Sequence, residues 1–348
     1  MYHVVEITRA LWTRLRSESE RESYRAAARY RRDGDALSFI CETHQQLPAQ
    51  PPSDRRSLVL FAHFDAQGIV DPYVVHYLEA LHRLGATIIF VSSSPTLTPE
   101  SVVPIRPLCA GIYTRRTLSL DFGSWHLAWC IMRERGWSLD HFDRLVICND
   151  SVYGPLFPIE EMWSSFRDAD MYGAIESGVQ KTHLQSFFLA WDLNARTRSF
   201  LNDFWNDFQY VVDKLVLIRR CEVAISTRAR KAGLRIRPFL SIDAVRAAYE
   251  LSPNHQWFNM LSRTGSLNNT IYYWDGLIEH LRFPFLKTSL PRYNEPWHDS
   301  MQQLREFIER HTPYPYDLIQ SNVDRLGLGE ETWVRPTPAR RWIDAHRV

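Results

Sequence analysis

The segment HFDRLVICNDSVYGPLFP, residues 141–158, constrains the fold of this chain more than any other. Its apolar run at residues 145–148 has no polar side chain on either face, which is typical of a central strand covered on both sides in a parallel α/β sheet. The run ends in Asn149, Asp150 and Ser151. Because open α/β folds bind ligands at the carboxyl ends of their strands, Asp150 is predicted to face a pocket. Alternatively, Asp150 only caps the turn that follows.

Apolar runs alternate with amphipathic segments along most of the chain, which predicts repeated strand-helix-strand units. Two of the predicted helices end at glycines, Gly85 and Gly136, as helices often do. Beyond about residue 250 the periodicity weakens. The predicted strands are 57–65, 86–94, 110–116, 145–148, 171–176 and 184–192, the last a candidate for antiparallel pairing, and the main predicted helices are 74–85, 121–136, 200–212, 222–233 and 301–311.

Composition limits the classes of function. The chain has 348 residues, of which 45% are hydrophobic, enough for a large core. The formal net charge is only +1, so no overall field attracts nucleic acid, and nucleic acid is not expected as a partner. The five cysteines are scattered without a CxxC pair, which indicates reduced thiols rather than disulfides or a zinc site. With no signal-like or membrane-spanning apolar run, a cytoplasmic location is expected.

Six segments carry a resemblance to a known family. They are FAHFDAQGIVDPYVVHYLEAL at 61–81, DFGSWHLAW at 121–129, CNDSVYGPLFP at 148–158, THLQSFFLAW at 182–191, CEVAIS at 221–226 and TIYYWDGLIEHLRFPFLK at 270–287. In this order they resemble the rhamnan synthesis protein F family, glycosyltransferases that build rhamnose-containing cell-surface polysaccharides. The resemblance covers roughly residues 57–290, and the Asn-Asp-Ser-Val-x-Gly-Pro segment is its most specific part.

The resemblance implies an α/β, Rossmann-like A-type glycosyltransferase fold with a mostly parallel central sheet. The sequence as a whole is expected to form three regions: an N-terminal helical extension at 1–55, a nucleotide-sugar core at 56–250, and a C-terminal helical extension at 251–348 that completes the acceptor side. The expected activity is inverting transfer of a deoxyhexose, with rhamnose favoured, from a nucleotide diphosphate donor. The favoured donor is dTDP-L-rhamnose, and the expected acceptor is a lipid-linked glycan in O-antigen or rhamnan synthesis.

Two other classes of function compete with this one. A non-catalytic carbohydrate-binding or assembly subunit of the same fold is motivated by Asn149-Asp150-Ser151, which has one carboxylate where A-type enzymes often have two. A nucleotidyl or phosphoryl transferase would need a glycine-rich phosphate loop, and the sequence has no G-x-G-x-x-G or G-x-x-x-x-G-K motif.

Glu222 is the expected catalytic base, because it matches the acidic segment that supplies the base in many inverting glycosyltransferases. Alternatively, it is an ordinary first-turn glutamate favoured by the helix dipole. Asp150 is the expected ligand of Mg²⁺ or Mn²⁺, which prefer oxygen ligands. Arg219 and Arg220 are expected to clamp the diphosphate of the donor, unless they are solvated surface charges.

The other expected donor-binding residues lie at strand ends or at the start of a helix. The alternatives are that His63 is a buried core histidine and that Asp121 is a helix N-cap. His183 and Gln185 are expected to reach the acceptor. The donor-binding set is His63, Asp65, Ser92, Ser93, Ser94, Asp121, Asn149 and Asp150, together with Arg219 and Arg220.

Three further features are interpreted without a catalytic role. Asp168 and Asp170 form a literal Asp-x-Asp, but they precede a predicted strand, so a solvated connector is expected. Trp205 is expected in the core. The arginine-rich segment 8–32 and the tail with Arg340, Arg341 and Trp342 are expected to be solvated helices, or alternatively a peripheral contact with the inner face of the membrane.

Overall fold

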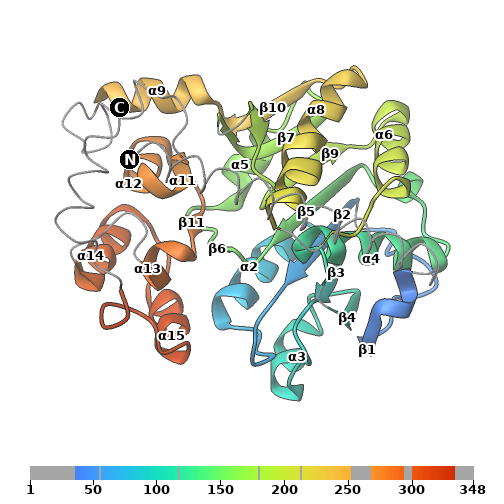
Figure 1. Ribbon diagram of the computed structural model, residues 1–348, viewed down its shortest axis with the longest axis horizontal. Coiled ribbons are helices and arrows are strands. Elements are labelled where there is room, and N and C mark those ends of the chain that lie inside the picture. Colours follow the sequence, from blue (N-terminus) through green and yellow to red (C-terminus); the bar gives the residue numbers. More distant parts are fainter. Residues whose placement is uncertain are drawn as a thin grey trace, which may run out of the picture.

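The computed structural model describes residues 36–54, 56–116, 118–178, 181–211, 214–251, 268–293 and 300–333. These residues form a central sheet with helices on both faces (Figure 1). The predicted arginine-rich helix at 8–32 and the basic tail lie outside the described residues. Within them, no helix is long and apolar enough to cross a bilayer.

The strands of the central sheet follow the order β1-β4-β3-β2-β5-β9-β7-β10, and β8 pairs with β7 beside this path. β2 pairs in parallel with both β3 and β5, and β3 pairs in parallel with β4. β9 is antiparallel to β5 and β7, and β10 is parallel to β7. The strands are β1 (Ile40–Gln45), β2 (Ser57–His63), β3 (Ala86–Ser92), β4 (Gly111–Arg115), β5 (Arg144–Asn149), β7 (Met171–Ser177), β8 (His183–Leu184), β9 (Phe188–Asp192) and β10 (Ile236–Leu240).

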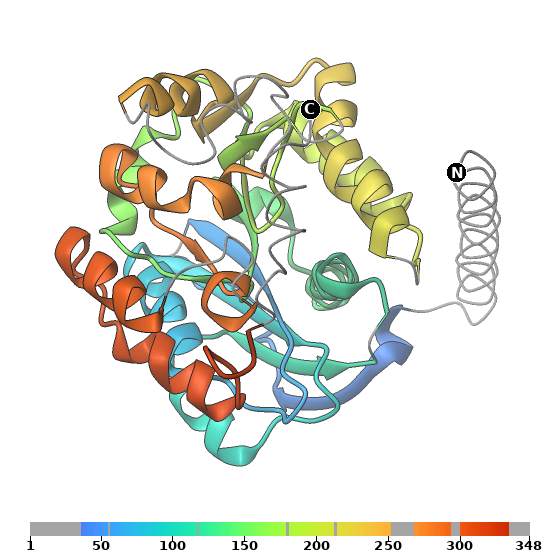
Figure 2. The ribbon, with the colours of Figure 1, turned by 60° about the vertical axis from the view of Figure 1, so that its left-hand side comes forward.

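Alternate residues of each central strand face two separate cores. Val59 and Phe61 of β2 pack into one core, while Leu58 and Leu60 pack into the other. Figure 2 shows the orange and red C-terminal helices on the opposite side of the sheet from the yellow helices. The first core is covered by α2 (Pro72–Arg83), α3 (Pro99–Ile105), α5 (Ile159–Ser165), α9 (Ile242–Leu251), α11 (Asn269–Tyr272), α12 (Trp274–Leu281), α13 (Ser289–Tyr293), α14 (Met301–His311) and α15 (Asp317–Arg325), and the second by α4 (Leu120–Glu134), α6 (Ala195–Asn206), α7 (Lys214–Leu217) and α8 (Val223–Lys231).

The direction of the chain across the sheet reverses between β2 and β5. From β2 the chain moves outward through β3 to β4, and it then crosses back to β5 on the other side of β2. The connecting helices α2 and α4 consequently lie on opposite faces, which opens a crevice at the carboxyl ends of β2 and β5. Asp150 immediately follows β5, as the sequence pattern predicts.

Several elements differ from the sequence prediction. β1 lies inside the segment predicted as an N-terminal helical extension, and it pairs antiparallel with β4 at the sheet edge. The predicted helix at 200–212 instead spans Ala195–Asn206, because Asn194 caps its start through the N–H groups of Arg196 and Thr197. The strand β10 and the helices α9 and α15 have no counterpart in the prediction. β10 carries Arg237 and Pro238 at the opposite sheet edge, where a broken apolar pattern is tolerated.

Asp170 is a correction to the predicted solvated connector. Asp170 is only 1% exposed, and its carboxylate accepts hydrogen bonds from Arg235 N at 2.9 Å and Asn194 Nδ2 at 3.0 Å. It therefore joins the start of β7 to the segments that precede β10 and α6. Trp205 is 1% exposed, which confirms its predicted place in the core.

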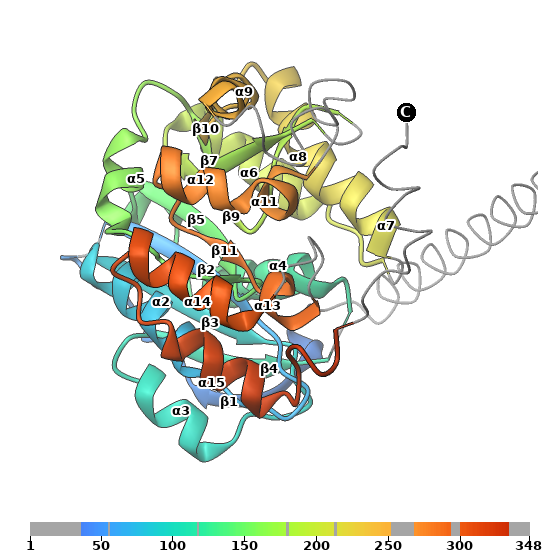
Figure 3. The ribbon, with the colours of Figure 1, turned by 90° about the vertical axis from the view of Figure 1, so that its left-hand side faces the viewer.

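The C-terminal segment is tied to the sheet by strand pairing and by charge. Figure 3 shows α12, α14 and α15 in front of the central sheet. β11 (Leu286–Lys287) pairs antiparallel with β6 (Val152–Tyr153), just after Asp150. The Arg325 guanidinium donates to Asp65 Oδ2 at 2.6 Å and to Asp71 Oδ1 at 2.8 Å.

We expect Arg325→Met to lower the free energy of unfolding by about 3 kcal/mol at pH 7, because it leaves two buried carboxylates without their cation. Burial alone would raise the pKa of Asp65, but the Ile69 N–H and Arg325 lower it overall. The Asp65 contribution is therefore present above about pH 4 and is lost as the pH falls through its lower folded-state pKa. Urea unfolding of the variant and the wild type at pH 7 and pH 3 measures this.

Arg282→Met is the matched control, since Arg282 forms an exposed ion pair with Glu161. Its loss should stay below about 1 kcal/mol. Equal losses in the two variants would show that the Arg325 pairs do not hold the C-terminal segment.

Candidate active site

A pocket of about 340 Å³ lies beside the carboxyl end of β5. This volume is within the range of small-molecule sites. Six segments of the chain contribute to its walls: the start of α4, the end of β5, the turn before β9, the helix from α7 to α8, the start of α11, and β11 with α13. The polar and charged lining includes Asp121, Asn149, Ser186, Lys214, Glu222 and Lys287.

Asp121 and Asn149 form one wall of this pocket. Asn149 Nδ2 donates to Asp121 Oδ2 at 2.7 Å, and Asn149 Oδ1 accepts from the Ser151 hydroxyl at 2.7 Å. Burial, together with the nearby charge of Asp150, raises the pKa of Asp121 to about 6. The structure thus brings together two of the predicted donor-binding residues.

The loop before Asp121 is held in a strained conformation. Ser119 and Leu120 have φ of 61° and 43°, a region that non-glycine residues rarely adopt. The buried Arg115 donates to the carbonyls of Leu118 and Leu120, both at 2.7 Å. Ser119 is the residue before α4, so Asp121 is not the N-cap, contrary to the alternative interpretation. Such strain persists only where the surrounding contacts fix it.

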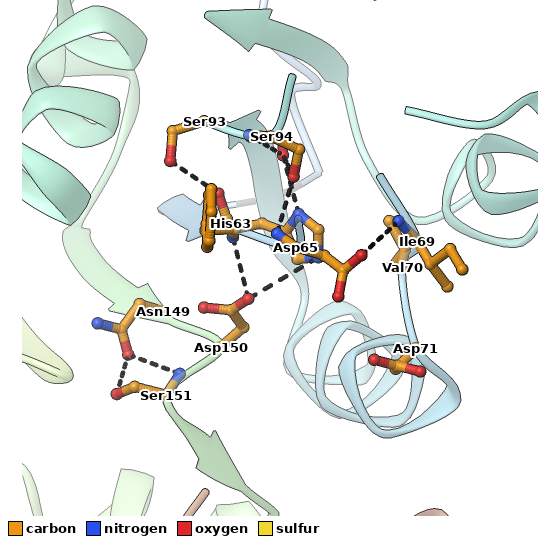
Figure 4. A network of polar contacts seen from close by, with 12 residues as sticks. His63, Asp65, Ile69, Val70, Asp71, Ser93, Ser94, Asn149, Asp150 and Ser151 are labelled. Atoms are coloured by element: carbon orange, nitrogen blue, oxygen red, sulfur yellow. Dashed lines mark hydrogen bonds and ion pairs between the residues drawn. The ribbon is translucent and has the colours of Figure 1, made fainter. Parts of the chain in front are cut away.

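Asp150 points toward the end of β2 (Figure 4). Its Oδ2 accepts from Phe64 N at 3.0 Å and lies 3.8 Å from His63 Nε2. The carboxylate therefore joins two strands and does not cap the turn that follows. Burial raises the pKa of Asp150 to about 7, although the Phe64 N–H and Arg292 oppose this. Among the described residues, its other oxygen has no hydrogen-bond partner.

The polar residues at the ends of β2 and β3 do not reach the pocket. His63 Nδ1 lies 2.9 Å from the Ser92 hydroxyl, which in turn donates to Ser94 Oγ at 2.8 Å. Ser93 N donates to the His63 carbonyl at 2.8 Å. All four residues are buried, and burial lowers the pKa of His63 to about 4, so its ring is neutral near pH 7. This favours the core-histidine interpretation of His63. The predicted pocket-lining role of Ser92–Ser94 is replaced by a network that joins two strand ends.

The Asp65 carboxylate is bonded to other parts of the fold. Its Oδ1 accepts from the N–H groups of Gln67 and Ile69 at 2.9 and 3.1 Å, and its Oδ2 bonds to Arg325. Both carboxylate oxygens are therefore engaged in the fold.

Glu222 lies within a helix and does not open one. Lys214–Leu217 is α-helical, Ile218–Glu222 forms a π turn, and α8 continues directly from it. The first-turn interpretation is therefore wrong. Glu222 lines the pocket, and the neighbouring Cys221 lines a hollow elsewhere. π turns often occur at functional sites.

The Glu222 carboxylate is oriented by one backbone group. Its Oε1 accepts from Ser186 N at 3.1 Å. Among the described residues, its other oxygen has no hydrogen-bond partner. This arrangement leaves one carboxylate oxygen available to a ligand.

The structure does not bring Arg219 and Arg220 to the pocket. Arg220 lines a separate hollow of about 330 Å³ together with Phe204, Phe208 and Arg228, and Arg219 is exposed. The pocket cations are instead Lys214 and Lys287, which the sequence interpretation missed. Lys287 is the last residue of the family-like segment 270–287, and its place in that segment is the sequence feature that could have indicated a role in the site.

The predicted acceptor residues are buried behind the pocket wall. His183 Nδ1 donates to the Lys181 carbonyl at 2.7 Å. Gln185 donates to Asn268 Oδ1 at 3.1 Å and accepts from the Thr270 hydroxyl at 3.3 Å. Since Asn268 lines the pocket, Gln185 acts on the pocket through Asn268.

A divalent cation in this pocket would need ligands from a bound substrate as well as from the protein. Among the described residues, no group of three His, Cys, Asp or Glu side chains could hold a metal ion on its own. Asp121 and Asp150 are close enough for the charge of Asp150 to raise the pKa of Asp121. Mg²⁺ is often held by one or two carboxylates together with substrate phosphates and water. Asp121 lines the pocket, whereas Asp150 lies between the lining residues Asn149 and Ser151 without lining it itself.

The α/β fold and this charged pocket at the strand ends define an A-type nucleotide-sugar glycosyltransferase, which confirms the predicted fold class. The chain belongs to the rhamnan synthesis protein F family, whose model matches residues 88–339. No curated protein matches the chain.

Solved structures give distant similarities. A nucleotide-diphospho-sugar transferase structure from Desulfovibrio desulfuricans G20 aligns with a TM-score of 0.34 and 14% identity, covering 58% of this chain and 90% of that one. The glycosyltransferase GlyE of Streptococcus pneumoniae TIGR4 aligns with a TM-score of 0.36 and 10% identity, covering 79% and 66%. At these TM-scores the likeness carries no weight for mechanism.

We expect the Ser119 hydroxyl to stabilise the strained loop, since it donates to the Val211 carbonyl at 2.9 Å and accepts from Val211 N at 2.6 Å. Ser119→Ala should lower the free energy of unfolding by about 2 kcal/mol, because both bonds are lost. Ser119→Gly loses the same bonds but relieves the positive φ, so its loss should be about 1 kcal/mol smaller. Urea unfolding of both variants measures the difference. Equal losses would contradict backbone strain at this position.

Proposed function

We propose that this protein transfers a deoxyhexose, with rhamnose favoured, from a nucleotide diphosphate donor to a glycan acceptor with inversion. The observation that carries the proposal is the Glu222 carboxylate in a pocket that also contains two lysines and the Asp121–Asn149 pair. Family membership supports dTDP-L-rhamnose as the donor and a lipid-linked glycan of O-antigen or rhamnan type as the acceptor.

The mechanism begins at Glu222. One of its oxygens is held by Ser186 N, and the other accepts the proton of an acceptor hydroxyl. The acceptor oxygen attacks the anomeric carbon from the face opposite the leaving group, which inverts the configuration. A positioned base of this kind contributes about a hundred- to ten-thousand-fold in rate.

The leaving nucleoside diphosphate carries negative charge that the site must stabilise. Asp121 and Asp150 would hold Mg²⁺ or Mn²⁺, which would act as a Lewis acid on the leaving diphosphate. Asn149 orients Asp121 through its amide, so the donor wall is fixed before the ligand binds.

A lipid-linked acceptor would require the protein to work at the inner face of the cell membrane. The segments expected to make that contact, 8–32 and the tail, lie outside the described residues. The competing function, a carbohydrate-binding or assembly subunit, predicts donor binding without turnover.

We expect one donor family to raise the melting temperature of the protein and to release nucleotide during incubation with an acceptor glycan. The panel is dTDP-L-rhamnose, GDP-rhamnose, GDP-fucose and UDP-sugars, each with Mn²⁺ and with a chelator. Chelation should abolish nucleotide release, and Mn²⁺ or Mg²⁺ should restore it. Stabilisation without turnover supports the non-catalytic subunit. Full turnover in chelator would remove the metal from the proposal.

We expect Glu222→Gln to lower kcat by about a hundred- to ten-thousand-fold with little change in donor affinity, because the amide cannot accept the proton. Donor affinity is measured by calorimetry, and kcat by nucleotide release. Glu176→Gln is the matched control, since the Glu176 carboxylate accepts a hydrogen bond from Ile242 N and does not line the pocket. Near-normal turnover in Glu222→Gln would end the assignment of Glu222 as the base.

A further inference from the structure

Two lysines line the pocket from segments that are far apart in the chain. Lys214 is the first residue of α7, and Lys287 is the last residue of β11. Both line the pocket, together with the carboxylates of Asp121 and Glu222. The pocket lining therefore carries positively charged side chains from two separate segments.

The helix places Lys214 and Glu222 at different ends of the same wall. Lys214, Leu217, Ile218 and Glu222 all line the pocket, so they share one face across the π turn. At 1.5 Å per residue, the eight positions from Lys214 to Glu222 span about 12 Å. An ammonium group and a carboxylate separated in this way can bind different parts of one extended ligand.

The backbone of Lys287 is held by the short β11 strand. It pairs with Val152 through the β11–β6 ladder, and Thr288 N donates to the Ser151 carbonyl at 3.1 Å. Its Nζ lies 4.0 Å from the centre of the Phe187 ring, a cation–π distance. This places a positive charge beside the Asn149–Ser151 end of β5.

The arginines expected to bind phosphate lie elsewhere. Arg220 lines the hollow that also contains Cys221 and Phe208, on a different surface of the same helix. The cations that line the pocket itself, and that a nucleotide diphosphate could contact, are Lys214 and Lys287.

We propose that Lys214 and Lys287 bind the diphosphate of the nucleotide donor and stabilise it as it leaves. This inference rests on the proposed function and assigns its leaving-group site. As the acceptor oxygen forms its bond to the anomeric carbon, the bond from that carbon to the β-phosphate oxygen breaks. The electron pair leaves with the nucleoside diphosphate, the acceptor proton goes to Glu222, and both ammonium groups keep their protons.

The test is calorimetric binding of dTDP, UDP and GDP, each compared with its nucleoside, in chelator and in Mg²⁺. The variants are Lys214→Met, Lys287→Met and the double variant, and Arg220→Met is the matched control. Each lysine variant should bind the diphosphate about tenfold to a hundredfold more weakly, as expected for a lost hydrogen bond to a charged group. Nucleoside binding should not change, and Arg220→Met should match the wild type.

Circular dichroism and the nucleoside affinity show whether each variant is folded. As a second measurement, the loss of affinity with added salt should be less steep in the double variant, because fewer charge contacts remain. Wild-type diphosphate affinity in the double variant overturns the inference alone. If Arg220→Met loses diphosphate affinity and the lysine variants do not, the phosphate site lies at the arginines and the inference is wrong. A wild type that binds no nucleoside diphosphate overturns the proposed function itself.

Discussion

The parallel pairing of β2 with β5 is the constraint on which the rest of the structure depends. Its register places Ala62 opposite Asn149, so that the two strands end together. The next residues then meet: Phe64 N donates to the Asp150 carboxylate at 3.0 Å. The helices α2 and α4 lie on opposite faces of the sheet. A crevice beside the carboxyl end of β5 follows from this order of the strands.

The C-terminal segment supplies charge to this crevice. Arg325 pairs with Asp65 and Asp71, whereas Arg292 bonds to the neutral oxygens of Tyr73 and Asn322. Tyr73 in turn donates to the Asp150 carbonyl at 2.9 Å. The acidic ends of the core strands are thus balanced by cations from residues more than 130 positions later in the chain. The core and the C-terminal segment share one electrostatic environment.

The sequence predicted the fold better than it predicted the roles of individual side chains. The strands β2, β3, β5 and β9 are long apolar runs that only a sheet covered on both faces can bury, so their pattern is unambiguous. Polar residues after such strands have two possible uses, binding a ligand or bonding to neighbouring backbone groups. Asn149 lines the pocket, while Ser92 sits in a buried network, and nothing in their local sequence separates them. That difference depends on which strand lies beside each one.

The π turn has a consequence for the entropy of catalysis. Glu222 lies at the end of this turn, within a continuous helix rather than on a loop. A helix has already lost its backbone freedom on folding, so little more is lost when a substrate arrives. The backbone that carries the carboxylate is therefore preorganised, because its conformational entropy is lost during folding and not when a ligand binds.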